Sequence, residues 1–312
     1  MIGDYLKSVR DAWNHFWFVP RSAETLALIR ILVGAMLLYS HCVWTVELST
    51  FFGSDSIIPT QYRHSFLYSG GASWSHFDWS ASSVWLWGSH VVALVAFAMF
   101  TLGWFTRVTA ILSFLFVVSY ANRATGALFG LDQISAFLTL YLAISHCGSR
   151  YSLDEKFSAK QGRAVSSVAN NIATRLIQIH MCIVYLFAGT GKLAGPTWWN
   201  GEAIWGTLAS YEYQTFDMTW IAGVLWLVNL LTYATVAWEI SYSFLIWSKL
   251  TRPLVLAFAL FTHLGIGIAM GMMTFGLVML FGNLAFVSPG FTASVFRRFE
   301  SGREVLPEVA QT

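Results

Sequence analysis

The sequence predicts an all-α, polytopic integral membrane protein: a helix bundle of about eight transmembrane helices with both termini in the cytoplasm. Three observations support this prediction. Of the 312 residues, 56% are hydrophobic and 11% are charged, whereas about 25% are charged in a typical soluble domain. Apolar runs recur along the chain at lengths near the roughly 20 residues that cross a hydrocarbon core. Lysine and arginine are distributed unequally between alternate loops.

Three segments divide the chain. Residues 1–22 are basic and aromatic without a small-residue cleavage site, so we expect an interfacial helix rather than a removable signal peptide. Residues 23–290 form the transmembrane domain, and residues 291–312 form a polar cytoplasmic tail. The predicted spans lie near residues 23–46, 84–104, 107–121, 131–147, 172–193, 219–247, 253–271 and 273–288. The third, fourth and eighth runs are short, so one of them is alternatively a re-entrant segment.

The loop charges predict the orientation, because lysine and arginine accumulate on the cytoplasmic side. With the N-terminus inside, the outer loops hold Arg63 and Arg123. The cytoplasmic segments then hold Lys7, Arg10, Arg21, Arg107, Arg150, Lys156, Lys160, Arg163, Lys249, Arg252, Arg297, Arg298 and Arg303. This asymmetry supports both the number of spans and the cytoplasmic location of the termini.

The long loops differ in composition. The outer loops 47–83 and 194–218 are rich in aromatic residues, and we expect them to fold back onto the membrane face. The inner loop 148–171 is polar and basic and has no apolar periodicity. We therefore expect this loop to be a solvated linker between two four-helix halves.

Several classes of site have no sequence signal. The chain has no Walker, dinucleotide-binding, HExxH or GxSxG motif, and its three cysteines show no CxxC spacing. We therefore expect no disulfide framework and no bound metal. A net charge of +2 gives no indication of a nucleic-acid partner.

A polar stripe runs along the predicted fifth span. Gln178, Tyr185 and Lys192 are seven residues apart, a spacing that returns to nearly the same face of a helix. Gly189 and Gly191 flank the lysine and let a neighbouring helix or a ligand approach closely. An amine desolvated in such a place loses basic strength and becomes a usable general base.

Lys192 and Asp132 each have a second interpretation. Lys192 lies at the outer end of its span, where a lysine also reaches the interface by extending its side chain. Asp132 opens the fourth span and either caps that helix or faces Lys192 across a cavity.

Two further ionisable residues lie deep in predicted spans. Glu239 is ten residues from Lys249, and His263 is ten residues from Pro253, which places both about 15 Å from the inner helix ends. Equal depth on antiparallel neighbours predicts that they face the bundle interior within reach of one another. One interpretation is that they form a proton relay or contact a substrate. The other is that they form a structural hydrogen bond between helices.

The segment 175–201, RLIQIHMCIVYLFAGTGKLAGPTWWNG, resembles the signature of the vitamin K-dependent γ-glutamyl carboxylase family and its bacterial relatives, the HTTM (horizontally transferred transmembrane) domain proteins. The resemblance continues more weakly through Glu239, the segment 263–276 and the RYSLD sequence at 150–154. The matching positions are Ile183, Val184, Tyr185, Phe187, Ala188, Gly189, Lys192, Leu193, Trp198 or Trp199, and Gly201.

The resemblance implies a function. Lys192 aligns with the base that deprotonates vitamin K hydroquinone, a reduced quinone, and Trp198 and Trp199 then form a lid under which its ring stacks. The family reaction occurs on the non-cytoplasmic side, here that of a bacterial inner membrane. The sequence departs from the family where it reads GTGKL, with one lysine in place of two adjacent lysines, and where it lacks a histidine near Asp132.

Three functions remain open at this point. The first is a quinone-linked oxidase, epoxidase or carboxylase (a lyase), with Lys192, Tyr185 and Gln178 as catalytic residues. Its cofactor-binding residues are Trp198, Trp199, Gly189, His263, Glu239 and Asp132. The second is a non-enzymatic membrane helper in the maturation of a secreted peptide, protein or toxin. The third is a transporter of small solutes, lipids or other hydrophobic small molecules across the bilayer, although no inverted repeat supports it.

Overall fold

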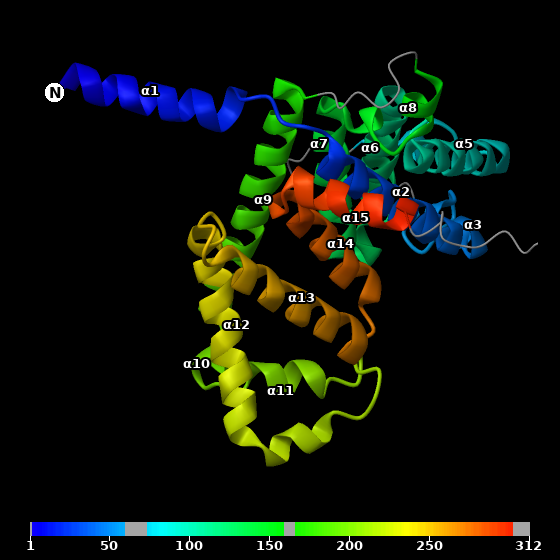
Figure 1. The fold of residues 1–312 in the computed structure, drawn as a ribbon. Helices are drawn as coiled ribbons and strands as arrows, with labels where there is room; N and C mark the ends of the chain where they lie inside the picture. Colours follow the sequence, from blue (N-terminus) through cyan, green and yellow to red (C-terminus); the bar gives the residue numbers. More distant parts are fainter. Residues whose placement is uncertain (1, 60–73, 159–165, 302–312) are drawn as a thin grey trace, which may run out of the picture. The chain divides into compact units, whose positions relative to one another are not determined.

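The computed structural model describes residues 2–59, 74–158 and 166–301, which are helical apart from turns, loops and one isolated β-bridge between Arg21 and Ser167 (Figure 1). The chain divides into two compact units. The first comprises Met1–Leu128, Ser135–Arg175 and Val287–Thr312, and the second comprises Phe129–Ile134 and Leu176–Phe286.

A helix lies at each of the eight predicted spans. The first unit contains α1 (Ile2–Phe18), α2 (Glu24–Val46), α3 (Leu48–Phe52), η1 (His76–Trp79), α5 (Ser83–Leu102), α6 (Thr106–Arg123), η2 (Thr125–Ala127), η3 (Cys147–Ser149), α8 (Leu153–Phe157) and α15 (Pro289–Ser301). The second unit contains α10 (Pro196–Trp199), α11 (Ala203–Leu208), η4 (Thr219–Gly223), α12 (Leu225–Leu245), α13 (Arg252–Ala269), α14 (Met273–Asn283) and η5 (Leu284–Phe286). Residues of both units belong to α7 (Gly130–Ile144) and α9 (Val168–Lys192).

Four helices of the described residues are long and apolar enough to cross a membrane, namely α2, α5, α9 and α13. Residues 273–286 and 289–297 pass the same test together, but they are bent by 111° at the break between them. The other predicted spans coincide with helices that are shorter or less apolar. The all-helical fold and these apolar helices are those of a helical membrane protein.

The first unit is built on a close contact between α2 and α5. A Cβ atom at Gly34 would lie 2.6 Å from Oγ1 and 2.9 Å from Cα of Thr101, so only glycine allows the two backbones to approach this closely. The buried residues Leu37 and Phe97 belong to the same two helices. Small residues at a helix contact are what membrane helices use to pack tightly.

The described part of the inner loop is folded, so the prediction of a solvated linker is wrong there. The Asp154 carboxylate accepts hydrogen bonds from the backbone N–H groups of Phe105 and Thr106, at 2.9 and 2.8 Å, and from the Thr106 hydroxyl at 2.6 Å. These bonds cap the start of α6. Ser152 caps α8 in turn by accepting the backbone N–H of Glu155 at 2.9 Å. Residues 159–165 lie outside the described residues.

The beginning of the predicted polar tail is also helical, and it packs on the first unit as α15. The Thr292 and Thr25 hydroxyls lie 3.2 Å apart, and the Phe296 ring stacks on Tyr151 with centroids 3.9 Å apart. This helix could not be predicted from the sequence, because its mixed apolar and charged composition resembles that of a tail. Residues 302–312 lie outside the described residues.

The predicted interfacial segment forms α1, whose described residues are exposed or half-buried. Its C-terminal end is held by α9: the Asn171 amide donates to the Phe16 carbonyl at 2.7 Å, and the Arg175 guanidinium lies 4.2 Å above the Phe16 ring. The helix is therefore anchored at one end and unburied along its length.

Glycines also set the helix contacts of the second unit. A Cβ atom at Gly276 would lie 2.3 Å from the His263 carbonyl oxygen, so α14 packs directly against the backbone of α13. A Cβ atom at Gly189 would lie 3.1 Å from the backbone nitrogen of Ile240. The close approach predicted beside Lys192 is therefore that of a neighbouring helix, α12.

Candidate functional site

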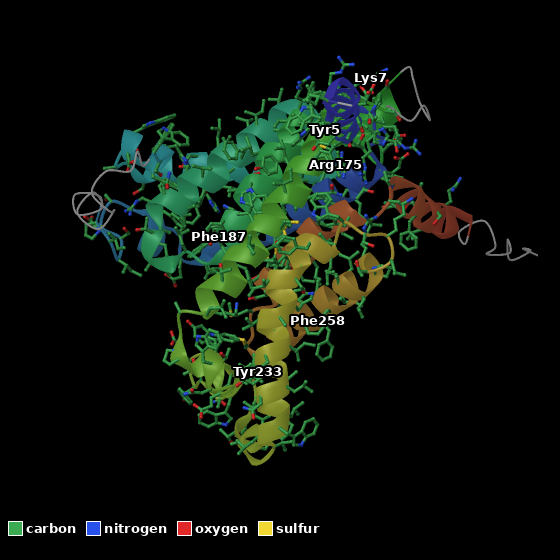
Figure 2. The ribbon with its side chains drawn as sticks, turned by 90° about the vertical axis from the view of Figure 1, so that its left-hand side faces the viewer. Tyr5, Lys7, Arg175, Phe187, Tyr233 and Phe258 are labelled. Atoms are coloured by element: carbon green, nitrogen blue, oxygen red, sulfur yellow. The ribbon has the colours of Figure 1, made fainter. Side chains whose placement is uncertain are left out.

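The polar stripe of α9 bonds to other helices of the second unit at all three positions. Gln178 is buried and donates to the Ala285 carbonyl at 2.8 Å, which ties α9 to the short helix η5. Tyr185 and Lys192 bond to residues of α13, α14 and α12. The three residues therefore share one face of α9, as the seven-residue spacing predicted. Phe187, outside the stripe, is 72% exposed (Figure 2).

Tyr185 lies at the centre of a fully buried hydrogen-bond network. Its hydroxyl lies 2.7 Å from Nε2 of His263 and accepts the Asn283 amide N–H at 2.9 Å. The Asn283 oxygen accepts the Tyr242 hydroxyl at 2.7 Å. The direction of the bond between Tyr185 and Nε2 of His263 follows the tautomer of the histidine, whose other ring nitrogen is Nδ1. Among the described residues, that Nδ1 has no hydrogen-bond partner.

Lys192 and Glu239 form an ion pair at the end of α9. The Lys192 ammonium nitrogen lies 2.9 Å from Oε1 and 2.7 Å from Oε2 of the carboxylate. The two side chains are 23% and 11% exposed. The lysine nitrogen also lies 5.2 Å from the centre of the Trp198 ring, within the range of a cation–π contact.

This pair changes two expectations. Glu239 and His263 are both buried, as predicted, but Glu239 bonds to Lys192 and His263 bonds to Tyr185, in place of the direct pair. Lys192 engages a buried carboxylate, which is a different arrangement from a lysine extended into the interface. Sequence reasoning missed the pairing because it placed Lys192 at a different depth from Glu239.

The other predicted site residues serve several roles. Trp199 is 63% exposed, and its indole N–H donates to the Leu193 carbonyl at 2.7 Å, so it is positioned by backbone rather than by Lys192. Asp132 accepts the Phe129 backbone N–H at 3.1 Å and caps α7, the first of the two roles considered for it. At Gly191 a Cβ atom would meet nothing within 4 Å, so no neighbouring helix packs closely against α9 at this position.

A second polar cluster, in the first unit, was missed from the sequence. His90 bonds through Nδ1 to the Tyr120 hydroxyl at 2.6 Å and through Nε2 to the Thr45 hydroxyl at 2.8 Å. The rings of His41 and His76 lie 4.5 and 5.8 Å from the Tyr120 ring. His41 and His90 lie inside predicted spans, where ionisable side chains mark candidate sites, so this signal could have found the cluster.

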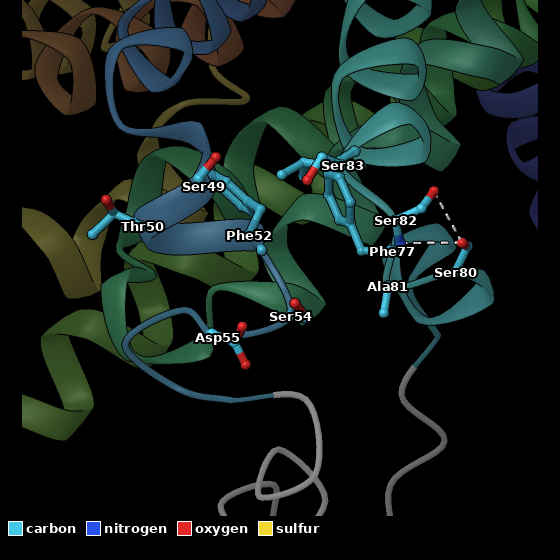
Figure 3. A pocket seen from close by; sticks show the side chains of 12 residues that line it. Ser49, Thr50, Phe52, Ser54, Asp55, Phe77, Ser80, Ala81, Ser82 and Ser83 are labelled. Carbon is cyan, nitrogen blue, oxygen red and sulfur yellow. Dashed lines mark hydrogen bonds between the residues drawn. The ribbon is translucent and has the colours of Figure 1, made fainter.

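The first unit also contains a hydroxyl-rich cavity of about 360 Å³, shown in Figure 3. Asp55 and the end of α3 line one side, and the Ser80–Ser82 turn lines the other, where the two hydroxyls lie 3.3 Å apart. The cavity holds no cationic side chain among its described lining residues. It is a polar surface pocket of the predicted outer loop.

Comparisons with known proteins do not assign this chain to a family: no family model, no curated protein and no solved structure matches it. Among the described residues, no group of three or more His, Cys, Asp or Glu side chains is placed to hold a metal ion. The ionisable and hydrogen-bonding side chains described for the α9 site include its lysine, carboxylate, tyrosine and histidine.

Proposed function

We propose that the second unit removes a proton from a lipid-soluble hydroquinone, with Lys192 as the general base and Glu239 as its proton store. One observation supports this proposal above the others: a lysine paired with a carboxylate, among apolar helices, and beside an aromatic ring. Charged groups at such a position are costly and are retained mainly where function needs them. A purely structural contact is made more cheaply by apolar residues.

The pair can accept one proton in two steps. Glu239 first takes a proton from the Lys192 ammonium, and apolar surroundings favour the neutral amine and carboxylic acid that result. The amine then takes the hydroxyl proton of the hydroquinone. The products are the hydroquinone anion beside the Lys192 ammonium and a neutral Glu239. The ammonium stabilises the new anion at short range.

The surrounding residues suit a ring that carries a hydroxyl. Trp198 already places an aromatic face against the Lys192 ammonium, and a Cβ atom at the adjacent Gly191 would meet nothing within 4 Å. Tyr185 lies about two helical turns before Lys192 on α9. Together with His263 it holds the helices in contact through the buried network described above. Their proposed role is to fix the position of α9 relative to α13.

The resemblance of segment 175–201 to the vitamin K-dependent carboxylase and HTTM proteins supports the same chemistry. By that resemblance, the hydroquinone anion is then oxidised by dioxygen, which takes up its electrons, in an oxidase, epoxidase or carboxylase reaction. The proposal places the site on the non-cytoplasmic side of a bundle of about eight spans. Cysteines at Ser54 and Thr215, in a variant without native cysteines, should react with an impermeant maleimide from outside, and a cysteine at Ser248 should not.

The test is hydroquinone-dependent oxygen consumption by the purified protein in lipid nanodiscs. Lys192→Arg keeps the charge of the pair but cannot yield a proton, so it should be folded and inactive. Glu239→Gln removes the proton store and should also be inactive. Lys249→Arg is the matched control, because Lys249 is exposed at the turn before α13, and it should keep wild-type turnover. Wild-type turnover in Lys192→Arg would exclude Lys192 as the general base.

A further inference from the structure

The hydroxyl-rich cavity of the first unit lies outside the site proposed on α9 (Figure 3). Its volume of about 360 Å³ falls within the range of about 300–1,000 Å³ that is typical of small-molecule sites. Six of its described lining residues carry a hydroxyl group, in segments 49–54 and 80–83, and Asp55 adds a carboxylate. Phe52 and Phe77 contribute two aromatic rings, whose centroids lie 5.4 Å apart.

A buried arginine fixes the wall that carries Ser54 and Asp55. Arg123, the last residue of α6, is 1% exposed. Its guanidinium donates to the Gly53 carbonyl on one side of these two residues. On the other side it donates to the Ser56 hydroxyl at 2.6 Å. The backbone that presents the Asp55 carboxylate is therefore held at both ends by one side chain.

The opposite wall is fixed to α5 and α6. The Ser75 hydroxyl donates to the Ser119 carbonyl of α6 at 3.0 Å. At the other end of this wall, Ser82 accepts the Trp85 backbone N–H at 3.2 Å and caps α5. The Ser80 hydroxyl accepts the backbone N–H of Ser82 at 3.2 Å, which sets the turn between them. Both walls thus have a position that the protein itself determines.

We propose that this cavity binds a neutral ligand with several hydroxyl groups, such as a hexose ring, and that the Asp55 carboxylate accepts hydrogen bonds from it. A carboxylate only accepts hydrogen bonds, whereas a serine or threonine hydroxyl both donates and accepts. A ring that carries hydroxyl groups on several carbons can satisfy both kinds of group at once. The inference is independent of the function proposed for Lys192, because the cavity belongs to the first unit.

The lining residues exclude other classes of ligand. An anionic head group would meet the Asp55 carboxylate, and no lysine or arginine among the described lining residues would balance the repulsion. A hydrocarbon chain would displace water from the hydroxyl groups without replacing its hydrogen bonds. A small ammonium ion would pair with Asp55 but would offer too few groups for the Ser80 and Ser82 hydroxyls on the opposite side (Figure 3).

The experiment is saturation-transfer NMR on the purified full-length protein in nanodiscs, with empty nanodiscs as the blank. The probes are methyl β-D-glucoside, methyl β-D-galactoside and methyl α-D-mannoside, each paired with the uronide of the same stereochemistry. We expect transfer to at least one glycoside. Its uronide, which carries a carboxylate, should show none at pH 7.5.

Two aspartates offer a matched pair of variants. Asp55→Asn should weaken glycoside binding by about tenfold, because it removes a charge-assisted hydrogen bond. It should also abolish the discrimination against the uronide, a readout that a purely structural role would not change. Asp78→Asn makes the same change at an exposed residue of the same predicted loop that does not line the cavity, and it should bind like wild type.

The source of the sugar is a separate arm of the experiment. Nanodiscs that contain monoglucosyl diacylglycerol should suppress the glycoside signal if the ligand is a glycolipid head group, and should leave it unchanged if the ligand is a soluble sugar.

Three results would overturn the proposal. The first is the absence of transfer from folded wild type to all three glycosides, and the second is equal glycoside binding by wild type and Asp55→Asn. The third is tighter binding of ethylammonium than of every glycoside, which would make the cavity an amine site.

Discussion

The Tyr185 hydroxyl lies 2.7 Å from Nε2 of His263, and this bond joins α9 to α13 inside the second unit. Both side chains are almost completely buried. The bond therefore sets the register of the two helices and gives the second unit a polar centre.

Tyr185→Phe removes the hydroxyl and leaves polar atoms of His263 and Asn283 unpaired. We expect the free energy of unfolding to fall by about 1–2 kcal/mol, the usual cost of such a loss. Tyr233→Phe is the control, because the Tyr233 side chain is 49% exposed and its hydroxyl donates to the Trp199 carbonyl outside the buried network. Thermal unfolding of both variants in detergent provides the measurement, and equal midpoints would contradict the account.

Gly189 and Gly191 test the helix contact beside the site. Gly189→Val should disrupt packing, because a Cβ atom there would lie 2.8 Å from Cγ1 and 3.1 Å from the backbone nitrogen of Ile240. Gly191→Val meets open space and should be tolerated. The yield of monodisperse protein by size-exclusion chromatography compares the two. Equal yields would show that α9 and α12 do not approach closely at Gly189.

Lys192→Ala should be strongly destabilised, although Lys192 is the last residue of α9. The variant leaves Glu239 as an unpaired, largely buried carboxylate, and breaking such a pair costs about 3–5 kcal/mol. The double variant Lys192→Met, Glu239→Leu removes both charges and should recover most of that loss. Chemical unfolding of the single and double variants measures the coupling. A double variant no more stable than Lys192→Ala would refute the pairing.

His76 makes stability depend on pH. Burial lowers its pKa to about 4 in the folded protein, compared with about 6.5 in an unfolded chain. Between these values the unfolded chain binds more protons, so stability falls as the pH drops from about 6.5 to about 4. The groups in contact with the ring include Ser119, Tyr120, Phe77 and Phe116, none of which changes charge in this window. The melting temperature of His76→Phe should decline less than that of wild type between pH 7 and pH 5.

Much of the fold could be predicted from the sequence, because membrane helices are long apolar runs with few exceptions. The helices fall at the predicted spans within a few residues. The described parts of the inner loop and of the tail could not be predicted. Their order comes from long-range contacts, such as the bonds from Asp154 to the start of α6 and the stacking of Tyr151 on Phe296, which leave no periodic pattern in the sequence.

The candidate site was predicted in part. Helical spacing indicated that Gln178, Tyr185 and Lys192 share a face, because that depends on local geometry alone. The partner of each residue could not be predicted, since pairing between helices depends on their relative depth and tilt. An estimate of depth from residue counts placed Glu239 opposite His263, whereas the long lysine side chain reaches Glu239 from the end of α9.

The most direct test of the central claim is the absorption spectrum of a short-chain naphthohydroquinone bound to the protein without oxygen at pH 7.5. The account predicts the spectrum of the hydroquinone anion with wild type, and the spectrum of the neutral hydroquinone with Lys192→Arg and Glu239→Gln, at equal occupancy. Anion formed equally by Lys192→Arg, or a neutral spectrum with folded wild type, would contradict the claim that Lys192 takes the proton.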